Sequence, residues 1–209
     1  DGVSLWRPWN IDPSWKTQSG QAWFHIDQHP ISKPGKQCIQ GLINLLPTSK
    51  EIGGNVVIPK SHNFFKDIPE EYKERVERLP LDIDHFRFPH DDPKLSSEPA
   101  VMAHMEPGDM LLWDSRTIHC SSSGSSLPQG TNDLIRAASL ICMMPKELSS
   151  KEILEKRIHA AENLVSTTNW TNDFRNADEF PIILEAENRD QYKWPKKPNL
   201  SDYQKELIA

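Results

Sequence analysis

The feature of the sequence that most constrains its fold is a series of short apolar runs. Each run has about the length of a β-strand and is bounded by turn-forming residues. The runs occupy residues 23–27, 38–46, 55–58, 101–104, 110–113 and 134–144. The pair Gly53-Gly54 and the tripeptide Pro107-Gly108-Asp109 are expected to form turns between them. Short strands separated by turns favour antiparallel sheets, so we expect a sandwich or barrel decorated by helices.

Two segments have the composition of helices. Residues 69–79 start with Pro69 and are rich in charged side chains, which predicts a short surface helix. In the second segment, Ser149 and Ser150 offer an N-cap, and Glu152 follows in the first turn. Apolar residues then recur at helical spacing: Leu154, Ile158, Ala161 and Val165. The sequence therefore predicts a C-terminal helix that begins near residue 150.

The remaining segments show no stable periodicity. Residues 1–20 read as an irregular lead-in, residues 80–99 as a long loop, and residues 121–133 as a loop rich in serine and glycine. A chain of 209 residues is long enough for one substantial core. We expect a single domain over residues 1–209, with its core at about 20–145 and a helical and irregular C-terminal extension at about 146–209.

Charge and composition exclude several classes of partner. The formal net charge of -6 argues against nucleic acid, whose binding is driven by clustered lysine and arginine. No apolar run approaches the roughly 20 residues of a membrane-spanning helix, so we expect no membrane partner. The three cysteines cannot all pair within the chain, and they favour a reducing compartment such as the cytoplasm. Because the chain begins with Asp1 and not methionine, the presence of an N-terminal targeting segment stays an open question.

The run "AWFHIDQHP" at residues 22–30 places a histidine and a carboxylate two positions apart. In a strand, His25 and Asp27 would project from the same face and could bind one metal ion. Such pairs also arise by chance, and the chain contains two others. His90-Asp91-Asp92 lies in an acidic loop without a rigid support, and His104-Met105-Glu106 ends at a proline turn. Both are better explained as solvated polar residues.

A third candidate ligand is His119, in the segment "GDMLLWDSRTIHCSS". Two histidines and one carboxylate form the facial triad, which leaves coordination positions open and favours non-haem iron(II). Oxygen chemistry requires such open positions. The alternative for His119 is a hydrogen-bonded histidine at the end of a strand.

The sequence resembles the phytanoyl-CoA dioxygenase family of iron(II)- and 2-oxoglutarate-dependent oxygenases. The segments that carry the resemblance span about residues 20–145: "HIDQ" at 25–28, "LLPTSKEIGGNVVIPKSH" at 45–62, "EPGDMLLWDSRTIHCSS" at 106–122 and "IRAASLICMMP" at 135–145. Their order and approximate separations match the family.

The resemblance implies a mainly β fold with a double-stranded β-helix, or jelly-roll, core like that of the cupins. It implies that His25, Asp27 and His119 are catalytic and ligate iron, and that Arg136 pairs with the distal carboxylate of 2-oxoglutarate. A guanidinium among apolar neighbours needs such an anion, although an Asp or Glu of the protein could supply it instead. Ser121 matches a family position whose hydroxyl assists the same carboxylate, and the alternative is an ordinary loop serine.

The function implied is an enzyme that uses O2 to hydroxylate or otherwise oxidise a small organic substrate, with decarboxylation of 2-oxoglutarate to succinate. Two alternatives belong to other classes. The chain could be a non-catalytic jelly-roll binding protein, or it could be a metal-dependent cupin-like enzyme that does not use 2-oxoglutarate, such as a zinc hydrolase. The identity of the substrate and the oligomeric state do not follow from the sequence.

Overall fold

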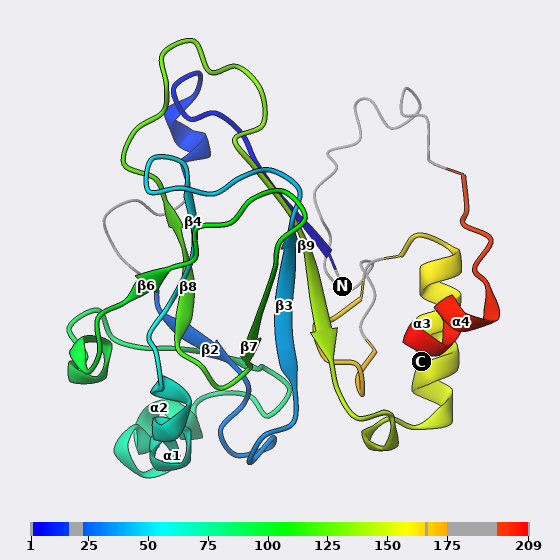
Figure 1. The fold of residues 1–209 in the computed structure, drawn as a ribbon. Coiled ribbons are helices and arrows are strands. Elements are labelled where there is room, and N and C mark those ends of the chain that lie inside the picture. Colours follow the sequence, from blue (N-terminus) through cyan, green and yellow to red (C-terminus); the bar gives the residue numbers. More distant parts are fainter. Residues whose placement is uncertain (1, 17–22, 166, 175–195, 209) are drawn as a thin grey trace. The chain divides into compact units, whose positions relative to one another are not determined.

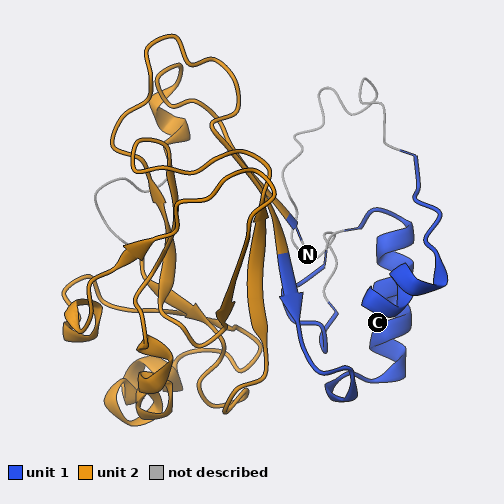
Figure 2. Ribbon diagram, in the orientation of Figure 1, with its two compact units in different colours: residues 1–2, 141–209 blue, residues 3–140 orange. Residues whose placement is uncertain are grey.

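The computed structural model describes residues 2–16, 23–165, 167–174 and 196–208. The chain divides into two compact units, which are coloured separately in Figure 2. We call residues 3–140 the β unit, and residues 1–2 together with 141–209 the C-terminal unit. The boundary at residue 140 lies near the expected end of the core at about 145. The assignment of both units to one domain stays a prediction.

Nine strands of the described residues form two sheets (Figure 1). Their bounds are β1 (Gly2–Trp6), β2 (His25–Asp27), β3 (Ile39–Asn44), β4 (Gly53–Val57), β5 (His85–Arg87), β6 (Val101–Met102), β7 (Met110–Asp114), β8 (His119–Ser123) and β9 (Arg136–Met143). The first sheet has the order β1-β9-β3-β7, and the second has the order β5-β2-β8-β4-β6. Strands pair antiparallel in β3–β7 of the first sheet and throughout the second. The expected mainly β class with a jelly-roll core is confirmed.

The two faces of the second sheet differ because side chains alternate along each strand. On one face, apolar residues of the strands join buried residues of the helical segments in the main core: Phe24, Ile26, Val56, Ile58, Phe65, Ile68, Val76, Phe86, Phe88, Ile118 and Cys120. The other face carries polar side chains that meet the first sheet. There, Gln40 on β3 donates to Asp27 on β2, and Arg136 on β9 donates to Ser121 on β8. The sheets therefore enclose a polar interior.

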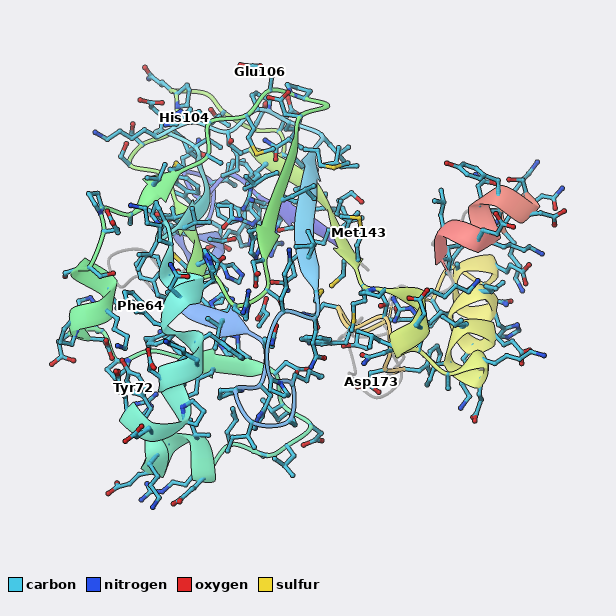
Figure 3. The ribbon with its side chains drawn as sticks, turned by 60° about the horizontal axis from the view of Figure 1, so that its bottom comes forward. Phe64, Tyr72, His104, Glu106, Met143 and Asp173 are labelled. Atoms are coloured by element: carbon cyan, nitrogen blue, oxygen red, sulfur yellow. The ribbon has the colours of Figure 1, made fainter. Side chains whose placement is uncertain are left out.

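The predicted helix at residues 69–79 consists of two short helices, α1 (Ile68–Glu71) and α2 (Lys73–Glu77), after a 3-10 segment at Ser61–Asp67. The interruption is at Tyr72, whose backbone leaves the helical region at φ -116° and ψ 33°. Its hydroxyl donates to Asp92 Oδ2 at 2.6 Å, and its ring packs edge-on against Phe86 and Phe88. Figure 3 shows Tyr72 beside these helices. Packing on the core thus outweighs continuation of one helix.

Two segments expected to be irregular contain strands, so those predictions are wrong. The loop at residues 80–99 includes β5, which pairs with β2, and a 3-10 segment at Pro93–Ser96. The lead-in at residues 1–20 includes β1 and a 3-10 segment at Pro13–Trp15, while residues 17–20 lie outside the described residues. Both strands depend on partners distant in sequence, which local composition does not reveal.

The Gly53-Gly54 pair is part of β4 and is not the expected turn. Gly53 has φ +101°, and a Cβ there would lie 2.3 Å from the carbonyl oxygen of Ser122 on β8. Glycine is needed at this position because two backbones approach closely inside the sheet. The serine-rich loop likewise starts later than expected, since residues 121–123 belong to β8.

The C-terminal unit contains the predicted helix as α3 (Lys151–Glu162). Ser150 is its N-cap and accepts a hydrogen bond from the backbone N–H of Ile153 at 3.2 Å, which confirms the prediction. A 3-10 segment at Lys146–Leu148 precedes it, and a further helix, α4 (Asp202–Ile208), was not predicted. Residues 175–195 of the expected extension lie outside the described residues. Within the described ranges, no helix has the length and hydropathy required to cross a bilayer.

Candidate metal centre

Three side chains singled out from the sequence converge in the interior between the sheets. His25 and Asp27 occupy alternate positions of β2, and the pairing of β2 with β8 puts His119 directly opposite His25. One potential ligand atom from each of the three lies within 4.8 Å of the other two. His25 Nε2 is 3.5 Å from Asp27 Oδ1, and His119 Nε2 is 3.4 Å from Asp27 Oδ2. Both imidazoles are buried, at 5% and 6% exposure.

The backbone fixes which ring nitrogen of each histidine faces the carboxylate. His25 Nδ1 lies 3.0 Å from the carbonyl oxygen of Trp23, and His119 Nδ1 lies 2.9 Å from that of Thr117. A carbonyl only accepts, so each Nδ1 carries the proton and each Nε2 presents its lone pair. Two lone pairs therefore face the oxygens of Asp27. A cation at this position converts that repulsion into ligation, so the donor set fits a metal ion.

The protonation states of the centre agree with metal ligation. Burial, followed by the neighbouring imidazole of His119, lowers the pKa of His25 to about 3. Near neutral pH the centre therefore offers a neutral imidazole and a carboxylate, which are the forms that bind metals.

The first sheet holds the carboxylate in place. Gln40, which is buried on β3, donates from Nε2 to Asp27 Oδ2 at 3.0 Å. Its amide oxygen accepts from Trp113 Nε1 on β7 at 3.1 Å. Because an indole N–H only donates, Trp113 fixes the orientation of the amide and directs its NH2 group toward Asp27. Neither residue was predicted, because the contact of Gln40 with Asp27 crosses from one sheet to the other and that of Trp113 with Gln40 depends on the pairing of β3 with β7.

His85 is a second contact of Asp27 that the sequence analysis missed. It lies opposite Asp27 in the β2–β5 pairing, and its Nδ1 is 3.5 Å from Asp27 Oδ1. Its ring centroid is 4.4 Å from that of His25, which also stacks on Trp23 at 4.5 Å. The His85 side chain is 44% exposed and so lies at the accessible side of the centre. The alternation of polar and apolar residues in "HFRF" at residues 85–88 was the available signal of a strand.

Arg136 enters the same interior from β9 and is only 2% exposed. Its Nη1 lies 3.4 Å from Ser121 Oγ, its guanidinium lies 4.6 Å from the ring centroid of Trp6, and its Nε has no partner among the described residues. Burial lowers its pKa to about 10, which leaves it charged at neutral pH. No carboxylate in the described part of the chain pairs with it. The structure thus brings Arg136 and Ser121 together and presents a buried cation able to take an anion.

The other polar motifs have structural surroundings. Asp92, from the acidic loop, accepts from the hydroxyl of Tyr72 and from the backbone of Lys94. His104 and Glu106 lie at the end of the β unit opposite to Tyr72 (Figure 3). Burial raises the pKa of Cys120 to about 12, so its thiol is a packing group and not a nucleophile. Among the described residues, only His25, Asp27 and His119 form a cluster with the geometry of a metal site.

Comparison with known proteins identifies a family and several similar chains. The sequence model of the family described as phytanoyl-CoA dioxygenase (PhyH) matches residues 12–127. A curated relative, "Ava biosynthesis cluster protein O" of Aspergillus versicolor, is 30% identical over an alignment of 176 residues; the match covers 80% of this chain and 53% of the relative. This chain therefore spans about half the length of that relative.

Solved structures also match, each over part of its length. AviO1 from Streptomyces viridochromogenes Tue57 superposes with a TM-score of 0.42 at 16% identity, over 69% of this chain and 48% of that chain. EctD from S. alaskensis, in the structure with 2-oxoglutarate and 5-hydroxyectoine, superposes with a TM-score of 0.38 at 14% identity, over 68% of this chain and 44% of that chain.

Proposed function

This chain belongs to the phytanoyl-CoA dioxygenase family, and we propose that it is an iron(II)- and 2-oxoglutarate-dependent dioxygenase that oxidises a small organic substrate. The observation that carries the proposal is one shared interior. It contains a cluster of two imidazoles and a carboxylate, and also a buried arginine for which the described residues supply no acidic partner.

His25, Asp27 and His119 would hold the metal through the two Nε2 atoms and a carboxylate oxygen. Iron(II) held by two histidines and a carboxylate keeps coordination positions open, and when bound it couples reduction of O2 to oxidation of the substrate and decarboxylation of 2-oxoglutarate to succinate. The hydrogen bond from Gln40 orients Asp27, and the backbone carbonyls of Trp23 and Thr117 fix the two imidazoles.

Arg136 and Ser121 would bind the distal carboxylate of 2-oxoglutarate. The guanidinium supplies charge and several donors, and the Ser121 hydroxyl can turn to donate to the same group. Because Arg136 is buried, its attraction to an anion is screened far less than on the surface. The substrate would approach from the accessible side, where His85 and Trp23 lie against His25.

The proposal is tested by adding 2-oxoglutarate to the protein and iron(II) without oxygen, and then admitting oxygen. We expect a charge-transfer absorption band on addition of 2-oxoglutarate, and succinate after oxygen enters. Asp27→Ala is expected to lose both signals. Absence of the band in a protein that binds metal would favour a cupin-like enzyme or zinc hydrolase. Binding of 2-oxoglutarate without succinate formation, with candidate substrates present, would favour a non-catalytic binding protein.

A further inference from the structure

Asn55 is a buried side chain for which the described residues supply no hydrogen-bond partner. It is 3% exposed, and both its Nδ2 and its Oδ1 are unpaired. Native proteins pair nearly all buried polar groups with protein, water or ligand, because an unpaired group loses its hydration without compensation. Within the described part of the chain, the side chain therefore remains available to bind water or a ligand.

The position of Asn55 in the sheet indicates where that partner lies. In the pairing of β4 with β8, Asn55 is opposite Ser121, and Val57 is opposite His119. Directly opposed residues of antiparallel strands project from the same face, with Cβ atoms about 5 Å apart. Asn55 thus shares the interior face with His119 and Ser121, and Ser121 in turn contacts Arg136.

The chemistry of this group points to an anion. Asn55 Nδ2 and Arg136 Nε are both buried donors without a partner in the described part of the chain, and Ser121 lies opposite Asn55 and contacts Arg136 through its hydroxyl. A carboxylate only accepts and has about four acceptor positions, so it can satisfy all three side chains at once. The Oδ1 atom of Asn55 is then left for an ordered water molecule.

We propose that Asn55 is a third binding residue of the cosubstrate site and donates from Nδ2 to the distal carboxylate of 2-oxoglutarate, beside Arg136 and Ser121. The inference rests on the function proposed above. It assigns the arginine, serine and asparagine to one end of the cosubstrate and the metal to the other. Loss of Asn55 therefore weakens only ligands that carry the distal carboxylate.

The test compares two ligands of the Mn2+-loaded protein by calorimetry in the absence of oxygen. 2-Oxoglutarate chelates the metal and carries the distal carboxylate, whereas oxalate chelates the metal without it. A hydrogen bond to a charged group corresponds to roughly 10-fold or more in affinity, so Asn55→Leu is expected to raise the Kd of 2-oxoglutarate by at least that factor. The Kd of oxalate is expected to stay within about twofold, because the metal contacts are unchanged.

Two further variants protect the test against a general loss of folding. Asn55→Asp is nearly isosteric and puts a carboxylate within the group that contains Arg136, so it competes with 2-oxoglutarate and leaves oxalate unaffected. Asn44→Leu is the matched control: Asn44 is also a buried asparagine, but it lies on β3, where its amide contacts Thr48 and Met105. It is expected to lower the melting temperature without changing the preference for 2-oxoglutarate over oxalate.

The outcomes separate the inference from the function on which it rests. If wild-type protein binds 2-oxoglutarate and Asn55→Leu changes neither ligand, or weakens both equally, the role of Asn55 is refuted while the function stands. In that case water fills the site, or the asparagine has a structural role only. If the wild-type protein binds Mn2+ but not 2-oxoglutarate, both proposals fall.

Discussion

At the scale of single residues, the carboxylate of Asp27 decides what the interior can bind. It faces the Nε2 atoms of His25 and His119 at 3.5 and 3.4 Å, and both nitrogens present lone pairs because their Nδ1 atoms donate to carbonyls. Three acceptors in one buried place are mutually repulsive without a cation. We therefore expect this arrangement to lower the stability of the metal-free protein.

Asp27→Asn is expected to change metal affinity and stability in opposite directions. The amide keeps the shape of the side chain, removes the charge and can donate to a histidine lone pair. We expect Mn2+ binding to weaken by about 100-fold or more, while the melting temperature of the metal-free protein rises. Calorimetry and thermal unfolding measure the two effects. A metal-free variant that melts below wild type would contradict the assigned tautomers.

The hydrogen bond from Gln40 provides a second prediction at this scale. Gln40→Met keeps nearly the same volume but removes the donor to Asp27, and loss of such a supporting contact typically weakens metal binding by about 10-fold or more. Trp113→Phe removes the donor that orients Gln40 and also shortens a ring whose centroid lies 5.2 Å from that of His119. It is expected to have a smaller effect in the same direction. Mn2+ titration checks both variants, with Asn44→Leu as the control. Equal Mn2+ affinity in Gln40→Met and wild type would show that Asp27 needs no such support.

At the scale of elements, the close pairing of β4 with β8 brings Asn55 and Val57 opposite Ser121 and His119. The pairing depends on glycine at the start of β4. A Cβ at Gly53 would meet the backbone of Ser122, Ser123 and Gly124 within 3 Å. The register of β4 with β8, which aligns the residues of the candidate site, therefore depends on Gly53.

Gly53→Ala tests that dependence, with Gly108→Ala as its matched control. Both glycines have a positive φ, +101° and +94°, but a Cβ at Gly108 would have nothing within 4 Å. Strained backbone conformations of this kind cost about 1–3 kcal/mol. Gly108→Ala therefore measures the cost of the strained backbone alone, whereas Gly53→Ala also includes the clash of its Cβ with β8. Denaturant unfolding should show the larger loss of stability for Gly53→Ala. Equal losses of stability in the two variants would mean that β4 and β8 do not approach as closely as the structure shows.

What the sequence predicts at this scale follows from the range of each interaction. The i, i+2 spacing of His25 and Asp27 and the N-cap at Ser150 are local, and both were visible without a structure. The pairing of β5 with β2, and hence the contact of His85 with Asp27, depends on a register between residues about 60 positions apart. The Gly53-Gly54 pair was misread because glycine serves both turns and tight strand contacts. The roles of His25, Asp27, His119, Arg136 and Ser121 stay predictions.

At the scale of the whole molecule, metal and cosubstrate are expected to act as stabilising ligands of the folded chain. A ligand that binds only the native state at 100 times its Kd adds about 2.7 kcal/mol to the free energy of unfolding. We therefore expect Mn2+ to raise the melting temperature and 2-oxoglutarate to raise it further. Arg136→Leu should abolish the second increment and retain the first. A variant that keeps both increments would exclude Arg136 from the cosubstrate site.

The account as a whole is tested most directly by a crystal structure of the protein grown with Mn2+ and 2-oxoglutarate, with anomalous scattering used to locate the metal. It predicts one anomalous peak bonded to His25, Asp27 and His119, with the distal carboxylate of 2-oxoglutarate on Arg136. A peak at other residues, or a cosubstrate that leaves Arg136 without an anion, would contradict it.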